Sequence, residues 1–454
     1  MSVHGIERRI ERPGAAAAPS LRGEMAGLVK LALPIVIALA SAMLIGVVDT
    51  IMIAPLGTEA LAAASIVASF GMIFYAGLYG FVSATGVRMA SAHGSGDAGA
   101  LAAATRAGLT IAALAGTGGA AAMLALLPSL DRLGQPREVT AIVGGYWAAM
   151  SLILVPYTVF YALKGLFDAV DAPWIGVALA FVAVALNVPA NWLLIHGIGG
   201  WEGFGLLGAG LASLLSQTVS LLVGWVVLRR AAVVGGARGP ARGLREERRA
   251  QWREGAAIAV GYVGEGGAFA LTGLMMGWFG AQALAANQIV TSVGVVLYMV
   301  PLGVSIAVSI RIGQARGAEA RERLRTIGLA ALAVVVGWMA AVMTAVLLGG
   351  AAISDALSED AEVVALATTL FVIVAAMQIG DGVQGAMLGA ARGMEDNRVP
   401  VAITLVCYWL LALPAAYALG FRTGLGPGGV WIGYGGGLAV AAVAVTWRFF
   451  AKAR

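Results

Sequence analysis

Twelve long apolar runs follow one another along the chain, and they restrict its fold more than any other feature. A run of about 20 apolar residues crosses the ~30 Å hydrocarbon core of a bilayer as a helix, whereas a membrane-spanning sheet needs shorter, alternating segments. The composition agrees, because 60% of the 454 residues are hydrophobic and only 12% are charged. The sequence therefore predicts an all-α polytopic membrane protein. The expected spans are residues 28–53, 61–90, 101–127, 139–166, 173–196, 207–230, 255–279, 283–311, 324–348, 361–390, 398–419 and 428–450.

The distribution of Lys and Arg predicts the orientation of these spans. With the N-terminus inside, 26 of the 29 Lys and Arg residues fall in inner loops or tails, and Arg132, Arg137 and Arg422 fall outside. This is the bias of a bacterial inner-membrane protein with both termini in the cytoplasm. Because the bias accounts for the net charge of +5, nucleic acid is not an expected partner. The first run is too long for a signal-peptide core and is expected to be a retained span.

The chain repeats itself once. Residues Ala54–Ile66 align with Gly277–Ile289 at an offset of 223, and an offset of 225 brings Pro189 onto Pro414. The offset of 223 also pairs Arg88 with Arg311 and Gly94 with Gly317. Two halves of six spans enter the membrane from the same side, which predicts two lobes related by a pseudo-two-fold axis along the membrane normal. The expected parts are a cytoplasmic tail (1–24), an N-terminal lobe (25–230), an Arg-rich cytoplasmic linker (231–254) and a C-terminal lobe (255–454).

Three carboxylates stand within the apolar runs, namely Asp49, Glu265 and Asp381. A carboxylate near the middle of a span costs roughly 2.5–3.5 kcal/mol on insertion scales, so each calls for a use or a partner. The remaining acidic residues are expected in loops or tails. These three side chains are therefore the predicted centre of function.

Several segments resemble the multidrug and toxic compound extrusion (MATE) transporters, and they cover nearly the whole chain from about residue 25. In the first half they are Leu33-Pro34, Val48–Met52, Leu56-Gly57 and Ala60–Ala62; in the second half they are Gly264-Glu265, Gly280–Gln288, Met299–Gly303 and Arg311–Gly317. The resemblance implies a V-shaped pair of six-helix lobes. It also implies export of amphiphilic organic cations in exchange for Na⁺ or H⁺, without another cofactor.

The resemblance also implies a set of ion-coupling and substrate-binding residues. In the first lobe Asp49 falls at the acidic position of the family, and Asn187, Asn191 and Ser213 fall at polar positions of its fifth and sixth helices. In the second lobe Glu265 and Asp381 match the acidic pair of the NorM-type branch. A Tyr often stands one turn before that Asp, but here the position is Met377, which weakens the case for sodium.

The chemistry leaves the coupling ion open. Burial disfavours an ionised carboxylate and a nearby cation favours it, so a buried carboxylate can exchange a proton or ion for a cationic substrate. Asp49 with Asn187, Asn191 and Ser213 offers the several oxygens that Na⁺ wants, whereas a proton needs only the carboxylate. The same polar groups could instead hydrogen-bond neighbouring helices together.

Other functions have weaker support in the sequence. No hydrolase, zinc-protease or P-loop motif is present, so neither an enzyme nor ATP-driven transport by this chain is expected. An intramembrane aspartyl protease would have no reason for a six-plus-six repeat. A flippase for a lipid-linked precursor would need a cationic cavity for pyrophosphate, and the spans are expected to hold almost no interior Lys or Arg. The single cysteine, Cys407, excludes an intrachain disulfide, and a monomer is expected to suffice.

Overall fold

The structure is a computed structural model that describes residues 20–133 and 137–454. Within these residues twelve helices, two of them interrupted, are long and apolar enough to cross a membrane, and the predicted all-α fold of twelve spans is confirmed. Residues 1–19 of the predicted tail lie outside the described part. The first six spans are α1 (Leu21–Ile53), α2 (Thr58–Gly94), α3 (Ala98–Leu126), α4 (Arg137–Leu152) with α5 (Leu154–Ala169), α6 (Pro173–His196) and α7 (Leu206–Arg230). The second six are α8 (Leu244–Gly277), α9 (Ala281–Gly317), α10 (Glu322–Leu357), α11 (Ala361–Gly393), α12 (Arg398–Val406) with α13 (Leu413–Arg422), and α14 (Gly426–Lys452).

Proline accounts for both interrupted spans. The fourth span breaks at Ile153, three residues before Pro156, and the eleventh passes through a π-helical turn, Cys407–Ala412, before Pro414. Proline lacks a backbone N–H, and its ring collides with the carbonyl four residues earlier. At these two positions the helix breaks or widens.

Several helices extend beyond the apolar runs that predict them. The helix α8 begins at Leu244, eleven residues before the expected span, so the Arg-rich segment between α7 and α8 is shorter than residues 231–254. Helical hydrogen bonds continue when a helix leaves the hydrocarbon, whereas hydropathy reports only the part inside it. Between the two helices, a short 3₁₀ segment (Ala232–Arg238) packs against α3.

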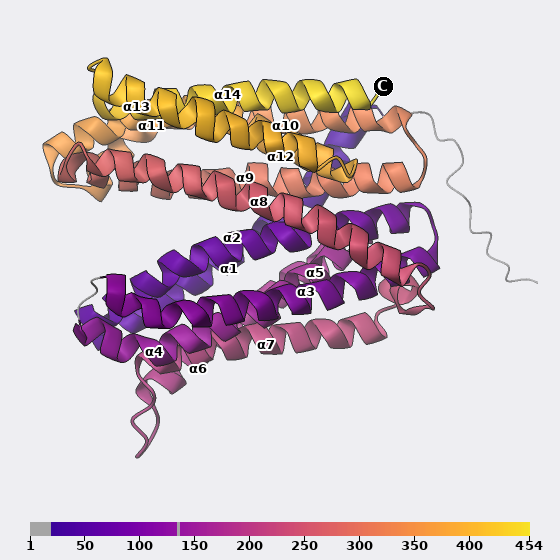
Figure 1. Ribbon diagram of the computed structural model, residues 1–454, viewed down its shortest axis with the longest axis horizontal. Helices are drawn as coiled ribbons and strands as arrows, with labels where there is room; N and C mark the ends of the chain where they lie inside the picture. The colour runs from indigo at the N-terminus through magenta and orange to yellow at the C-terminus, as the bar shows by residue number, and fades with distance from the viewer. Residues whose placement is uncertain (1–19, 134–136) are drawn as a thin grey trace, which may run out of the picture.

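The twelve spans form two bundles, α1–α7 and α8–α14, which lie side by side (Figure 1). The first helix of each bundle also packs across the interface: α1 contacts α9 and α10, and α8 contacts α2 and α3. One buried apolar cluster contains residues of both bundles, including Leu28, Met89 and Ile312. Two further clusters each belong to a single bundle. The bundles thus share a core at one end and have separate cores at the other.

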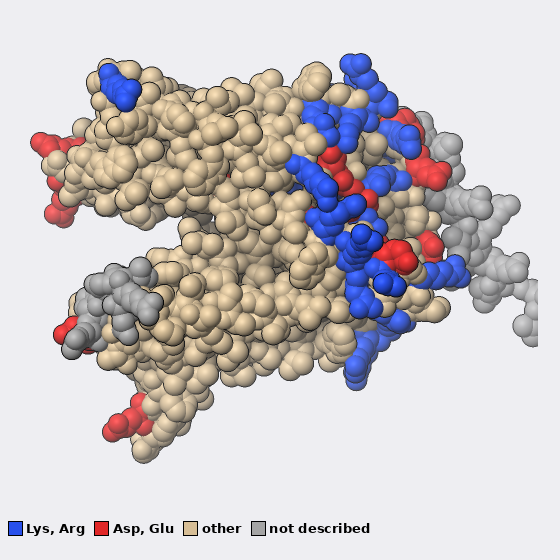
Figure 2. Space-filling view, viewed as in Figure 1, with Lys and Arg blue, Asp and Glu red and all other residues tan. Residues whose placement is uncertain are grey.

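The shared core lies at the end where Lys and Arg gather, and a hollow separates the bundles at the opposite end (Figure 2). Asp and Glu, but few Lys or Arg, mark the tips beside the hollow in this view. The C-terminus lies at the Lys/Arg end (Figure 1). The molecule is therefore V-shaped, with its opening away from the basic end.

Two glycines of the repeat let α2 and α9 approach each other where the bundles meet. A Cβ on Gly317 would lie less than 3.0 Å from the carbonyl oxygen of Ser91, and one on Gly94 would lie equally close to that of Gln314. Ser91 and Gln314 are themselves repeat equivalents, so the contact is reciprocal.

We expect Gly317→Val to destabilise the protein by about 1–3 kcal/mol or more, because the added side chain meets backbone that cannot move aside. The measurement is the melting temperature of purified protein in detergent. Gly118→Val is the matched control, since a Cβ on Gly118 meets no heavy atom within 4 Å. Equal melting temperatures for the two variants would contradict the close helix approach.

Candidate functional site

The carboxylate of Asp49 is held by three side chains from two other helices. Asn191 Nδ2 donates to Asp49 Oδ1 at 2.7 Å, Asn187 Nδ2 donates to the same oxygen at 3.3 Å, and Ser213 Oγ donates to Oδ2 at 2.8 Å. Both Asn side chains are fully buried, and Asp49 is 9% exposed. Asp49 lies on α1, the two Asn on α6 and Ser213 on α7. All four residues predicted for the first lobe thus meet at one point.

The local sequence explains this arrangement. Asn187 and Asn191 are four residues apart, which places both on one face of α6, and Asn191 Nδ2 also donates to Asn187 Oδ1 at 3.0 Å. The hydroxyl of Ser213 accepts a further hydrogen bond from Asn187 Nδ2 at 3.1 Å. The network therefore presents N–H and O–H donors to the carboxylate, and within these four residues only Asn191 Oδ1 is a buried acceptor without a partner.

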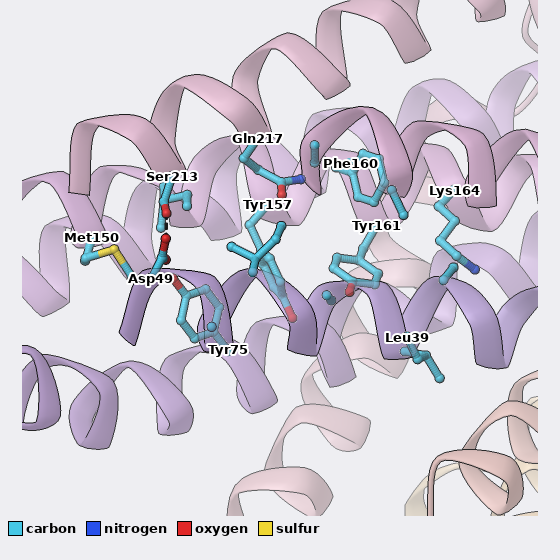
Figure 3. Close-up of a pocket in the computed structure, with 17 residues that line it drawn as sticks. Leu39, Asp49, Tyr75, Met150, Tyr157, Phe160, Tyr161, Lys164, Ser213 and Gln217 are labelled. Atoms are coloured by element: carbon cyan, nitrogen blue, oxygen red, sulfur yellow. Dashed lines mark hydrogen bonds between the residues drawn. The ribbon is translucent and has the colours of Figure 1, made fainter. Parts of the chain in front are cut away.

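Asp49 faces a cavity of about 260 Å³ within the first bundle. Tyr75, Tyr157 and Tyr161 line it, with ring centroids 4.8 Å apart for Tyr75–Tyr157 and 4.7 Å for Tyr157–Tyr161. Figure 3 shows Asp49 and Lys164 at opposite ends of this cavity, with the aromatic side chains between them. The site is thus a cavity lined by aromatic rings, with the carboxylate of Asp49 at one end and the amine of Lys164 at the other.

Glu265 and Asp381 meet in the second bundle. They come from α8 and α11 and line one cavity of about 220 Å³, together with Tyr298 of α9 and Tyr434 of α14. The hydroxyl of Tyr408 is within hydrogen-bonding reach of Glu265, and it also accepts a hydrogen bond from the Gln384 amide. The predicted acidic pair is therefore a spatial pair, although 116 positions separate the two residues in the chain.

Among residues 20–133 and 137–454, three acceptor oxygens near this pair have no hydrogen-bond partner. They are Asp381 Oδ1, Gln378 Oε1 and Gln384 Oε1, and all are buried. The two glutamines stand three residues before and after Asp381 on α11. Free oxygens in such a place attract a cation or a hydrogen-bond donor, since buried acceptors left unpaired are costly.

Met377 does line the cavity, as its place one turn before Asp381 suggests. The hydroxyls of Tyr298, Tyr408 and Tyr434 stand around the acidic pair instead of a Tyr at that position. Sequence reasoning missed these three because they come from three other segments of the chain. Gln378 and Gln384 could have been found from their spacing of one turn on either side of Asp381.

Two expectations about charged residues are wrong. Asp168, expected in a loop, is 2% exposed on α5 and accepts a hydrogen bond from Lys164 Nζ at 2.6 Å. Lys164 itself lines the Asp49 cavity, and Arg392 of α11 lines two smaller cavities. The interior therefore holds Lys and Arg, because both residues stand near the ends of apolar runs, where α5 and α11 carry charges into the space between the bundles. The i, i+4 spacing of Lys164 and Asp168 is the sequence signal that was overlooked.

Two repeated bundles around a cleft that opens at one end, with carboxylates facing a cavity inside each bundle, are the architecture of a membrane transporter. Solved structures have the same fold. A MATE transporter from Vibrio cholerae, in a bent form, superposes with a TM-score of 0.85 at 19% identity, covering 95% of this chain and 97% of that chain. A transporter from Pyrococcus furiosus superposes with a TM-score of 0.84 at 20% identity, with the same coverage.

Comparison with family models and curated sequences identifies the family. The MatE model matches twice, over residues 34–193 and 257–418, which together make up more than half of the chain. Proteins named as probable multidrug resistance protein NorM are 33% identical in Bradyrhizobium diazoefficiens, covering 96% of this chain and 95% of the relative, and in Pseudomonas aeruginosa, covering 95% and 90%. The chain belongs to the MatE family. It is a multi-pass bacterial membrane transporter and not an enzyme.

Proposed function

We propose that this protein exports amphiphilic organic cations by alternating access, in exchange for Na⁺ or H⁺. The observation that carries the proposal is that each bundle places carboxylates in a cavity lined by aromatic rings. The carboxylates offer charge to a cation, and the rings offer flat apolar surface and cation–π contact. The names of the relatives support a drug as the solute. We also propose that a monomer suffices.

The two carboxylate sites suit different ions. Around Asp49 the amides and the hydroxyl present donors, so Na⁺ would require Asn187 and Asn191 to turn their oxygens inward. A proton requires no such change. In the cavity of Asp381, the oxygen of Gln378 has no hydrogen-bond partner among the described residues, and a hard cation prefers oxygen ligands. We therefore propose protonation at Asp49 and sodium binding at Glu265 and Asp381.

The proposed orientation is that of a bacterial inner-membrane protein with both termini in the cytoplasm. The gathering of Lys and Arg at the closed end of the V supports it, because cytoplasmic loops carry this excess. With this orientation the V is open to the outside. Export then requires a second state that is open at the basic end.

Reciprocal ion pairs hold the basic end closed. Glu24 of α1 is fully buried between Arg311 of α9 and Arg323 of α10, at 2.7 Å and 2.8 Å. Arg88 of α2 pairs with Glu247 of α8 at 2.6 Å. The offset of 223 relates Glu24 to Glu247 and Arg88 to Arg311. In each of the two pairs, a glutamate of one half therefore binds an arginine of the other half. We propose that inward opening breaks these pairs.

We expect Glu24→Gln to increase the inward-open population at least about tenfold, because removing one partner of a buried ion pair costs about 3–5 kcal/mol in the state that contains it. The measurement is the distance between spin labels at Ser95→Cys and Arg325→Cys in a Cys407→Ser background, by pulsed electron paramagnetic resonance. Ser95 and Arg325 are exposed and belong to different bundles. Glu322→Gln is the control, since Glu322 is an exposed acid in the first turn of α10, next to Arg323. An unchanged distance distribution in Glu24→Gln would refute the role of these pairs.

The first experiment on function is efflux of a fluorescent organic cation from proteoliposomes under an imposed sodium gradient or, separately, a pH gradient. Drive by either gradient would support antiport, and the one that works identifies the coupling ion. A response to neither would reject the proposal.

The alternative function is that of a flippase for a lipid-linked precursor, and a transport assay distinguishes it from cation export. A flippase needs cationic side chains inside the protein, and Lys164 and Arg392 line an interior cavity. However, Lys164 is paired with Asp168, and the relatives are named for multidrug resistance. Translocation of a lipid-linked pyrophosphate by the same proteoliposomes, with no cation efflux, would favour the flippase.

A further inference from the structure

Two smaller cavities lie between the carboxylate cavities of the two bundles and share lining residues with them. A cavity of about 50 Å³ between the bundles is lined by Lys164 of α5 and Arg392 of α11. It shares Lys164 with the Asp49 cavity. A third cavity shares Arg392 with it and shares Glu265 with the cavity of Asp381. Four cavities with shared lining residues thus lie between Asp49 and Asp381, and Lys164 and Arg392 are two of the shared side chains.

Arg392 differs from Lys164 in having no ion-pair partner among the residues that the structure describes. Among the described residues no carboxylate lies within 4.0 Å of its guanidinium. Its one side-chain hydrogen bond goes to the hydroxyl of Tyr262, at 3.2 Å, and its Cζ lies 5.2 Å from the centre of the same ring. Most of its N–H donors therefore have no hydrogen-bond acceptor within the described part of the chain.

Of the three acids near Arg392, two form ion pairs with other residues. Asp168 binds Lys164 at 2.6 Å. Asp396, which lines a cavity with Arg392, binds Arg448 at 2.7 Å and Lys452 at 3.1 Å. Burial disfavours the ionised form of Asp396, but the hydrogen bonds from Arg448 and Lys452 outweigh burial and hold its pKa below the usual value. Glu265, the third acid, lines this same cavity with Arg392, but its carboxylate lies farther from the guanidinium than an ion pair allows.

We propose that Arg392 binds a carboxylate, or a similar small anionic group, of the exported molecule. The inference rests on the proposed function and assigns the residue that recognises the negative end of a zwitterionic amphiphile. The positive end of such a molecule faces the carboxylates in either bundle. The negative end reaches Arg392 between the bundles. A guanidinium suits this role because its planar fork can donate two parallel hydrogen bonds to one carboxylate.

The surroundings of Arg392 fit a flat organic acid. Tyr79 packs edge-on against Tyr161 and against Tyr262, with ring centroids 5.2 Å and 5.8 Å apart. These rings come from α2, α5 and α8, so they surround the guanidinium from both bundles. Ring faces bind the apolar body of a ligand, while the charged group is bound by Arg392.

The test measures binding of two matched dyes to purified protein by fluorescence anisotropy. One dye is a rhodamine with a free carboxylate, which is zwitterionic, and the other is its ethyl ester, which is only cationic. We expect Arg392→Gln to weaken binding of the acid at least about tenfold, as for loss of a hydrogen bond to a charged group, and to change binding of the ester less than about twofold. Arg392→Lys, which keeps the charge but loses the fork, is expected to bind the acid with intermediate affinity.

The control is Arg398→Gln, an exposed arginine at the start of α12, which should bind both dyes as the wild type does. Equal losses for acid and ester in Arg392→Gln would overturn the inference and identify Arg392 as a structural residue or as the counter-ion of Glu265. Wild-type protein that binds the ester but not the acid would also overturn it, and would leave the proposed function intact. Failure to bind either dye would reject both the inference and the proposed cation site. Gel filtration and melting temperature show whether each variant is folded.

Discussion

Replacing Asp49 by Asn is expected to reduce efflux of an organic cation at least about 100-fold, the factor that corresponds to losing a buried charge interaction of about 3 kcal/mol or more. The substitution preserves shape and removes the charge that a proton, an ion or the substrate must share. It also turns an amide toward three donors, from Asn187, Asn191 and Ser213, so some loss of stability is expected. The measurement is the initial rate of efflux from proteoliposomes containing equal amounts of folded protein.

Two further variants complete the test of Asp49. Asp49→Glu retains the charge and is expected to recover part of the activity. Asp355→Asn removes an exposed acid from α10 and should leave efflux unchanged. Full efflux by Asp49→Asn would show that the network around it serves only to hold α1, α6 and α7 together.

Replacing Glu265 by Gln is expected to remove the sodium-driven part of efflux, with a reduction of at least about tenfold in sodium stimulation, because a hard cation loses a charged oxygen ligand. The amide of the variant would still reach Tyr408, so the packing between α8 and the π-helical turn should remain. The measurement is the initial efflux rate as a function of external sodium at constant pH.

Asp381→Asn is expected to have the same effect as Glu265→Gln, since the two acids line one cavity. Glu202→Gln, which changes an exposed acid in the loop between α6 and α7, is the matched control. If sodium dependence survived in both site variants while Asp49→Asn lost it, the ion site would belong to the first bundle. The two sets of variants together therefore locate the coupling ion.

The family resemblance is enough to locate much of the candidate site from the sequence. It selects Asn187 and Asn191, whose spacing of one helical turn puts them on a common face, and it selects Glu265 and Asp381, which prove to share a cavity. Residues outside the family motifs were missed. Lys164, Asp168 and Arg392 stand where apolar runs end, so an interpretation based on hydropathy placed them in loops or at the membrane surface.

The sequence alone determined the twelve spans, their division into two repeats and the end of the molecule that holds the positive charge. These are local properties, because transfer of a segment into hydrocarbon depends on its own residues, and an internal repeat is visible by aligning the chain with itself. The tertiary structure alone decided which distant residues meet: Glu24 with Arg311, Tyr408 with Glu265, and Arg392 with Tyr262. Such contacts join positions more than 100 residues apart, and they depend on how each helix rotates and crosses its neighbours. Packing between helices sets these angles, and no single segment encodes it.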